Sequence, residues 1–283
     1  MPVLPGARLE PVTEASTRRA REAAAGSYQN FRVSVEDAIA TVTIDRPSKR
    51  NALTVDMWRQ LSAICADLDA ETSLRAVVLT GAGQTFCAGA DISALSADEA
   101  SMREVVEHTE RALRELAVPT IAKIRGHCLG GGNQLAIACD LRVADSTASF
   151  GVPPAKLGVI YPVPSTRSLI ELVGPAWAKR LIFTAHPIDA DTALRIGLVE
   201  QVVEPAGLDA AVEALLAAIR PLSPMTQLAA KQLVNLIADG AGADSAYESW
   251  LSEWRASPDG VEGPQAFLQR RPPEFGWRRQ PPR

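Results

Sequence analysis

Three consecutive glycines, Gly130 to Gly132, constrain the fold of this chain more than any other feature. The apolar run over 120–124 before them predicts a strand, and the small residues over 135–139 after them predict a tightly packed helix. Glycines at such a junction let the backbone approach a ligand, and the peptide N–H groups of the helix start favour an anion. The junction therefore suits an anion or a developing oxyanion, although a tight turn and close helix packing need the same glycines.

The composition of the 283 residues is typical of a globular protein. Hydrophobic residues make up 47% and charged residues 22%, which is enough apolar material for a full core. A net charge of −4 without a basic block argues against nucleic-acid binding. No apolar run is long enough to cross a membrane, so we expect no membrane partner. The four cysteines lack metal-ligand spacing, which indicates reduced thiols, a cytoplasmic protein and no metal site.

Strand and helix patterns alternate in the first half of the chain, and helices predominate in the second. Alternating β-branched residues predict a hairpin over 31–44, and Thr54 caps a predicted helix that ends near Ala70. A further helix is predicted over 99–116. Amphipathic patterns predict three more helices, over 208–220, 224–238 and 244–256. This order predicts an α/β fold with parallel strand pairing and a helical C-terminal region.

Five motifs follow one another in an order that identifies a family. They are Asp45-Arg46-Pro47 with Asn51-Ala52-Leu53, the run Phe86 to Ile92, the glycine turn, Phe150-Gly151 with Leu157-Gly158, and Phe183-Thr184-Ala185 with Gly197-Leu198-Val199. Over residues 30–273 the chain resembles the enoyl-CoA hydratase/isomerase (crotonase) superfamily. The resemblance implies a crotonase-like spiral of ββα units and assembly as homotrimers or dimers of trimers. We expect a flexible extension over 1–27, a spiral core over 28–205, a helical trimerisation region over 206–273 and a flexible tail over 274–283.

The resemblance also implies which residues hold an acyl-CoA thioester. The backbone N–H groups of Ala90 and Gly131 would form an oxyanion hole, and Tyr161 would line the pocket at the carboxylate of a malonyl-type substrate. Coenzyme A is part of the substrate, so no separate cofactor is expected. The residues implied in binding the substrate or its CoA are Lys49, Arg50, Ala52, Ala88, Asp91, Ile92, Leu129, Gly130, Pro154 and Phe267. For Lys49 and Arg50, a solvated loop charge is an equally good interpretation.

Two positions depart from the hydratase pattern. Hydration of an enoyl thioester needs two carboxyl groups that act as base and acid, and the sequence has Gln134 and Pro154 where hydratases have these glutamates. Gln134 can position a ligand but cannot exchange protons at neutral pH. Glu107 and Glu110 share a face of the predicted helix with arginines nearby, which favours a solvated, ion-paired face over a catalytic base. Glu171 is likewise expected at the surface.

A reaction without a general base at its main step fits these departures. Loss of CO₂ from a malonyl-type thioester leaves the enolate directly, and the segments 154–161 and 181–188 are similar to methylmalonyl-CoA decarboxylases. Those enzymes have a histidine where this chain has Ala90. Despite this difference, the absence of both hydratase glutamates makes decarboxylation our first prediction. The alternatives are hydratase or isomerase activity on an unidentified acyl-CoA, and acyl-CoA binding without catalysis.

Overall fold

Two β-sheets frame the molecule, whose structure is a computed structural model that describes residues 28–91 and 99–280. The larger sheet has the order β1-β2-β3-β4-β6-β9, and its strands run parallel except at the β1–β2 hairpin. Its strands are β1 (Phe31–Glu36), β2 (Ile39–Ile44), β3 (Ala76–Gly81), β4 (Thr120–Ile124), β6 (Leu141–Asp145) and β9 (Gln201–Val203). The smaller sheet holds β5 (His127–Leu129), β7 (Ser149–Gly151) and β8 (Ile188–Asp189).

The chain winds between the two sheets as a spiral. One turn places β4 in the larger sheet and β5 in the smaller sheet before the helix α4 (Gly131–Ala138) begins. The next turn repeats this order with β6 and β7, followed by α5 (Pro154–Leu157) and the long helix α6 (Val163–Thr184). Short elements complete the frame: η1 (Pro47–Lys49), α7 (Ala190–Arg195) and η3 (Pro205–Gly207). The predicted α/β spiral is thereby confirmed.

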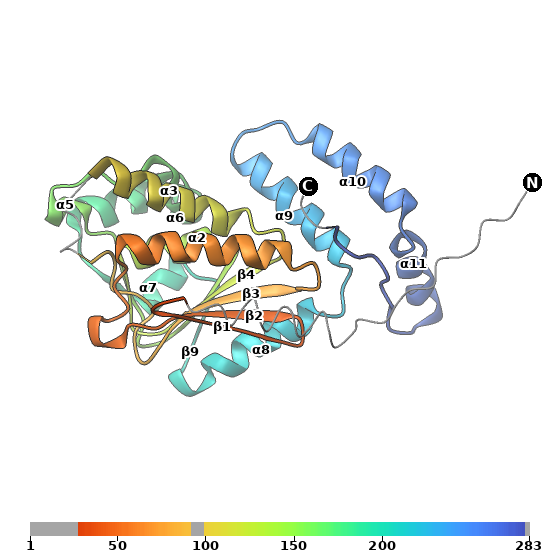
Figure 1. The fold of residues 1–283 in the computed structure, drawn as a ribbon, viewed down its shortest axis with the longest axis horizontal. Helices are drawn as coiled ribbons and strands as arrows, with labels where there is room; N and C mark the ends of the chain where they lie inside the picture. Colours follow the sequence, from red (N-terminus) through yellow and green to blue (C-terminus); the bar gives the residue numbers. More distant parts are fainter. Residues whose placement is uncertain (1–27, 92–98, 281–283) are drawn as a thin grey trace, which may run out of the picture.

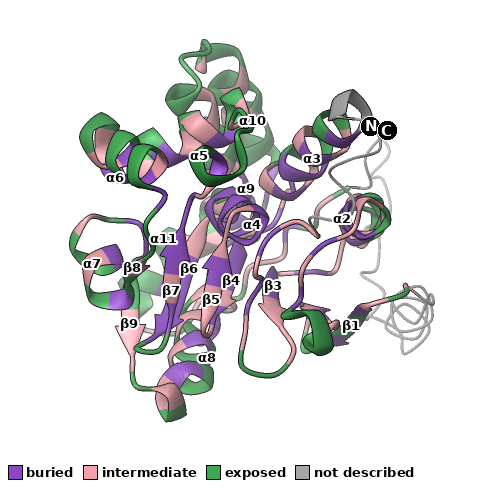
Figure 2. Cartoon of the chain, turned by 90° about the vertical axis from the view of Figure 1, so that its left-hand side faces the viewer, coloured by how far each residue is buried: buried purple, intermediate pink, exposed green. Residues whose placement is uncertain are grey.

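Helices cover both faces of the larger sheet (Figure 1). On one face lie α2 (Val55–Ala70) and α3 (Glu99–Arg114), and on the other lies α8 (Leu208–Ile219), which packs on Ile39, Val78 and Ile121. Thr54 caps the start of α2 as predicted, and its side chain accepts a hydrogen bond from the Met57 N–H at 3.2 Å. The helix α4 lies at the centre with every residue buried (Figure 2).

Three C-terminal helices form an arm that extends from the sheet (Figure 1). They are α9 (Pro224–Ala238), α10 (Asp244–Ala256) and α11 (Asp259–Gln269). The bounds of α8, α9 and α10 agree with the three helices predicted from amphipathic patterns. None of the described helices is long and apolar enough to cross a membrane.

The segment after α11 packs against the protein. Trp277 is buried, and its ring lies 6.2 Å from that of Trp250. The carboxylate of Asp259 accepts hydrogen bonds from the Gly276 and Trp277 N–H groups, each at 2.9 Å. Arg279 forms an ion pair with Asp69 on α2 at 2.7 Å. The expected flexible tail is therefore wrong for residues 274–280, whereas 281–283 and the extension 1–27 lie outside the described residues.

Candidate active site

The loop over 88–91 and the start of α4 bring the peptide nitrogens of Ala90 and Gly131 together. Leu53 pairs with this loop, since its N–H donates to Gly89 and its carbonyl accepts from Asp91, both at 2.8 Å. This pairing leaves the Ala90 N–H without a backbone acceptor among the described residues. A Cβ added at Gly131 would lie only 3.3 Å from the Ala90 nitrogen. The peptide N–H groups of Ala90 and Gly131 therefore lie close to each other.

Two glycines make this approach possible. Gly89 has a φ of 113°, in the region that disfavours side chains. A Cβ at Gly131 would lie 2.9 Å from the ring of Trp58, which is fully buried on α2. Gly130, the N-cap of α4, offers no side-chain hydrogen bond, so the helix start keeps its partial positive charge for a ligand. Close packing therefore occurs together with a helix start whose partial positive charge suits an anion.

A carboxyl group is buried next to α4. Glu110 on α3 is only 6% exposed and lies on the helix face that also buries Met102, Val106 and Leu113. The hydroxyl of Ser165 on α6 lies 2.8 and 2.9 Å from the two carboxylate oxygens, and it accepts a hydrogen bond from the Gln134 amide at 2.9 Å. The prediction that Glu110 belongs to a solvated, ion-paired face is therefore wrong.

The environment of Glu110 raises the pKa of its carboxyl group to near neutral pH. Burial, with a smaller contribution from the negative charge of Glu107, raises the pKa of Glu110 to about 7, although hydrogen bonds from Ser165 and Gln134 oppose the shift. At neutral pH this carboxyl group can therefore both accept and release a proton. Glu107 itself is half-buried, and Glu171 lies near the surface of α6, 3.9 Å from Arg114.

Two neighbouring polar side chains in the interior, Tyr161 and Asn133, have buried polar atoms without partners among the described residues. The hydroxyl of Tyr161 is enclosed although its ring is only partly buried, and it has no hydrogen-bond partner among the described residues. The amide of Asn133 is also buried and unpartnered; it lies near the Tyr161 hydroxyl without the geometry of a hydrogen bond. Burial raises the pKa of Tyr161, as does the charge of Glu110, so this hydroxyl stays protonated. Such buried groups are available to a ligand.

The loop that carries the predicted CoA-binding residues is tied to the oxyanion loop. Arg46 forms an ion pair with Asp91 at 2.8 Å and donates to the Ala52 carbonyl at 3.0 Å. The Ala88 N–H donates to the Arg50 carbonyl at 3.0 Å. The side chains of Lys49 and Arg50 are exposed here.

Four other predicted residues lie at different places, and one cannot be placed. Leu129 ends β5, and Gly130 donates to the Gly151 carbonyl at 2.9 Å. Pro154 is buried as the first residue of α5, whereas Phe267 is 84% exposed on α11. Ile92 lies outside the described residues.

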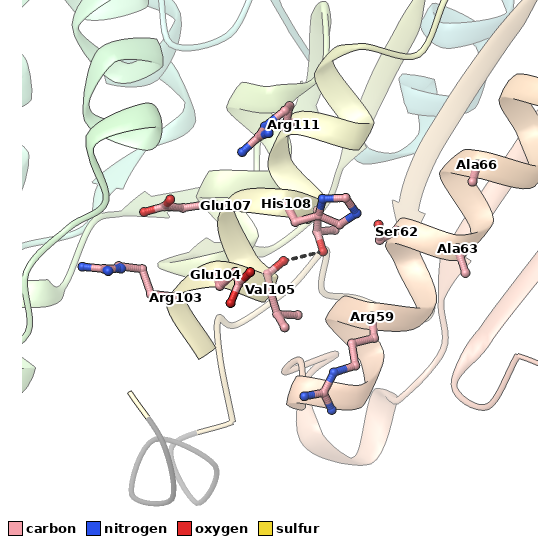
Figure 3. A pocket seen from close by; sticks show the side chains of 11 residues that line it. Arg59, Ser62, Ala63, Ala66, Arg103, Glu104, Val105, Glu107, His108 and Arg111 are labelled. Atoms are coloured by element: carbon pink, nitrogen blue, oxygen red, sulfur yellow. Dashed lines mark hydrogen bonds between the residues drawn. The ribbon is translucent and has the colours of Figure 1, made fainter. Parts of the chain in front are cut away.

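A separate open pocket of about 1000 Å³ lies between α2 and α3 (Figure 3). Its charged lining includes Arg59, Arg103 and Arg111, and the exposed His108 projects into it. Neither the paired amides nor Glu110 lines this pocket. Among the described residues, no three His, Cys, Asp or Glu side chains are grouped closely enough to hold a metal ion.

Sequence reasoning considered Glu110 and set it aside as a surface residue, and it did not single out Ser165. The signal for Glu110 was present, because it follows Met102 and Val106 at helical spacing and so falls on the apolar stripe of α3. Nothing in the sequence pattern joins Ser165 to Glu110, since the contact spans 55 residues.

Comparisons with known proteins identify the family of the chain. The enoyl-CoA hydratase/isomerase family matches residues 34–278. A short-chain-enoyl-CoA hydratase of Clostridium acetobutylicum is 39% identical over 71% of this chain and 78% of its own. A crotonyl-CoA hydratase of Syntrophomonas wolfei is 34% identical over 88% and 98%. The crystal structure of an enoyl-CoA hydratase/carnithine racemase from Magnetospirillum magneticum, 33% identical, superposes with a TM-score of 0.83 over 88% and 96%. The chain belongs to the enoyl-CoA hydratase/isomerase family, that is, to the crotonase superfamily.

Proposed function

We propose that the protein acts on an acyl-CoA thioester by enoyl-CoA hydratase/isomerase-type chemistry. The observation that carries the proposal is the pair of peptide N–H groups of Ala90 and Gly131 at the start of α4. The relatives named as hydratases support the same class of substrate.

The paired donors suit a thioester enolate. A thioester oxygen held between them would receive two hydrogen bonds that strengthen as negative charge develops on it. Each such donor typically contributes about 3 kcal/mol to stabilisation of the transition state. The N-terminus of α4 adds its partial positive charge. Lys49 and Arg50, exposed beside the oxyanion loop, would meet the CoA phosphates.

Charge around Tyr161 argues against decarboxylation, the first prediction from the sequence. A malonyl-type carboxylate at Tyr161 would lie near the carboxyl group of Glu110, whose charge acts on this tyrosine. Among the described residues, the groups that shift the pKa of Glu110 or Tyr161 include no cationic side chain. Two carboxylates without a cation repel each other in a buried site. Hydratase/isomerase-type activity therefore fits better than loss of CO₂.

Two substitutions at one position test the oxyanion hole. Gly131→Pro and Gly131→Ala both add a Cβ against Trp58, but only proline removes the N–H. We expect Gly131→Pro to lower kcat on enoyl-CoA substrates by a further 100-fold or more relative to Gly131→Ala. Proline is acceptable at the first position of a helix, and circular dichroism checks that both variants fold. Equal activities of the two folded variants would contradict the proposal.

A further inference from the structure

We propose that Glu110 is the acid–base residue of this site, and that Ser165 and Gln134 position its carboxylate. The inference rests on the proposed function, since removing a proton from an acyl chain requires a stabilised enolate. The carboxyl group would come from α3, whereas the two positions expected to carry glutamates hold Gln134 and Pro154.

The helix α4 connects this carboxyl group to the oxyanion donors. Gln134 follows Gly131 by three residues, so the two positions are neighbours on the helix surface. The Gln134 amide donates to the Ser165 hydroxyl, and that hydroxyl donates to Glu110. Two hydrogen bonds therefore link the Glu110 carboxyl group to Gln134, on the side of α4 that also carries the oxyanion donor Gly131.

The neighbouring groups leave Glu110 as the best-placed base. Tyr161 keeps its proton at neutral pH and can act as a donor, and Gln134 cannot exchange protons. Glu107 is half-buried one turn earlier on α3 and lines the separate outer pocket. The remaining rival is His127 on β5, whose Nδ1 is buried without a partner among the described residues. Its role can be separated from that of Glu110 by substitution.

The chemistry balances with one carboxyl group. The Glu110 carboxylate takes a proton from an acyl-chain carbon, and the C–H electron pair moves through the conjugated system to the thioester oxygen. The N–H groups of Ala90 and Gly131 hold this oxyanion. The neutral Glu110 then gives a proton, either the one it took or one exchanged with solvent, to the same carbon or to another carbon of the enolate system; solvent exchange at this stage is what labels the substrate in D₂O. When the proton goes to another carbon, the double bond moves, and no atom is gained or lost.

Ser165 and Gln134 act on the reaction through Glu110. A hydrogen bond from Ser165 favours the ionised carboxylate and fixes its direction, and Gln134 fixes the Ser165 hydroxyl in turn. Removing the hydroxyl should slow proton transfer and also shift its dependence on pH. A residue with a merely structural role would not shift the pH profile.

The test follows 3-hexenoyl-CoA in two ways: conversion to the 2-enoyl thioester by absorbance, and deuterium uptake in D₂O by mass spectrometry. We expect Glu110→Gln to slow both reactions by 100-fold or more. Glu115→Gln, at an exposed position just after α3, should stay within twofold of wild type. Ser165→Ala should lose most of the rate, and Ser165→Thr should restore it.

Each outcome bears on one claim. If Glu110→Gln keeps the wild-type rate while Gly131→Pro loses it, the oxyanion hole stands and the assignment of Glu110 is overturned. Loss of activity in His127→Gln but not in Glu110→Gln would move the base to β5. If the wild type catalyses neither reaction, both the proposed function and this inference are contradicted.

Discussion

The hydroxyl of Ser165 lies 2.8 Å from a carboxylate oxygen of Glu110, and this contact joins α6 to α3 in the buried interior. Gln134 on α4 adds the third helix to the network. Burying a carboxyl group costs free energy unless the group is hydrogen-bonded or protonated. The network supplies hydrogen bonds to Glu110, and the pKa of Glu110 near 7 also allows this carboxyl group to be protonated at neutral pH. Such a group is matched to proton transfer at physiological pH.

The pH profile of kcat/KM should report Glu110. As a base it must be ionised, so we expect kcat/KM to rise with pH through an apparent pKa near 7. Ser165→Ala removes a hydrogen bond to the carboxylate and should move this limb to higher pH by about one unit. Glu107→Gln removes a like charge and should move it to lower pH. Shifts in the same direction for both variants would contradict the assignment.

The stability of the fold should also depend on Glu110. The folded pKa, about 7, lies above the ordinary value of 4.5, so ionisation costs more in the folded state than in the unfolded state. The wild type therefore loses stability as pH rises through this window. We expect the stability advantage of Glu110→Gln over wild type to grow by about 2–3 kcal/mol between pH 5 and pH 8. Urea unfolding at both pH values measures it, and a constant difference would contradict the buried, shifted carboxyl group.

The C-terminal tail should contribute to stability. Trp277 is buried against Trp250, so Trp277→Ala should lower the free energy of unfolding by about 3 kcal/mol. Arg278→Ala, next to it and exposed, is the matched control and should change stability by about 0.5 kcal/mol or less. Denaturant titration compares the two variants. Similar values for both would mean that the tail is not docked in solution.

The C-terminal arm should mediate assembly. Its helices expose apolar side chains, among them Val234, Ile237, Val261, Phe267 and Leu268. Large apolar side chains exposed side by side, such as the sequence neighbours Phe267 and Leu268, typically mark an interaction surface. We expect a homotrimer or a dimer of trimers by light scattering, and dissociation when Phe267 and Leu268 are both changed to Asp. A monomeric wild type would contradict this expectation.

Helices and strands were predicted well from the sequence where they depend on residues close to one another in the chain. The Thr54 cap, the hairpin over 31–44 and the C-terminal helices follow from capping, alternation and helical periodicity. The close approach of Ala90 to Gly131 was accessible only through the family resemblance, because it joins segments 41 residues apart in the sequence. The burial of Glu110 was misjudged because only the charges nearby were considered, and not its place on the apolar stripe of α3. Its partner Ser165 is set by tertiary packing of α6, which no local pattern encodes.

The most direct measurement is mass spectrometry of the purified protein with 3-hexenoyl-CoA, crotonyl-CoA and methylmalonyl-CoA, each in D₂O. The account predicts deuterium uptake into the first, which Glu110→Gln abolishes, and no loss of CO₂ from the third. Addition of water to the second would be hydratase chemistry at the same oxyanion hole. Loss of CO₂ from methylmalonyl-CoA without deuterium uptake into the enoyl substrate would contradict the account and restore the decarboxylase prediction.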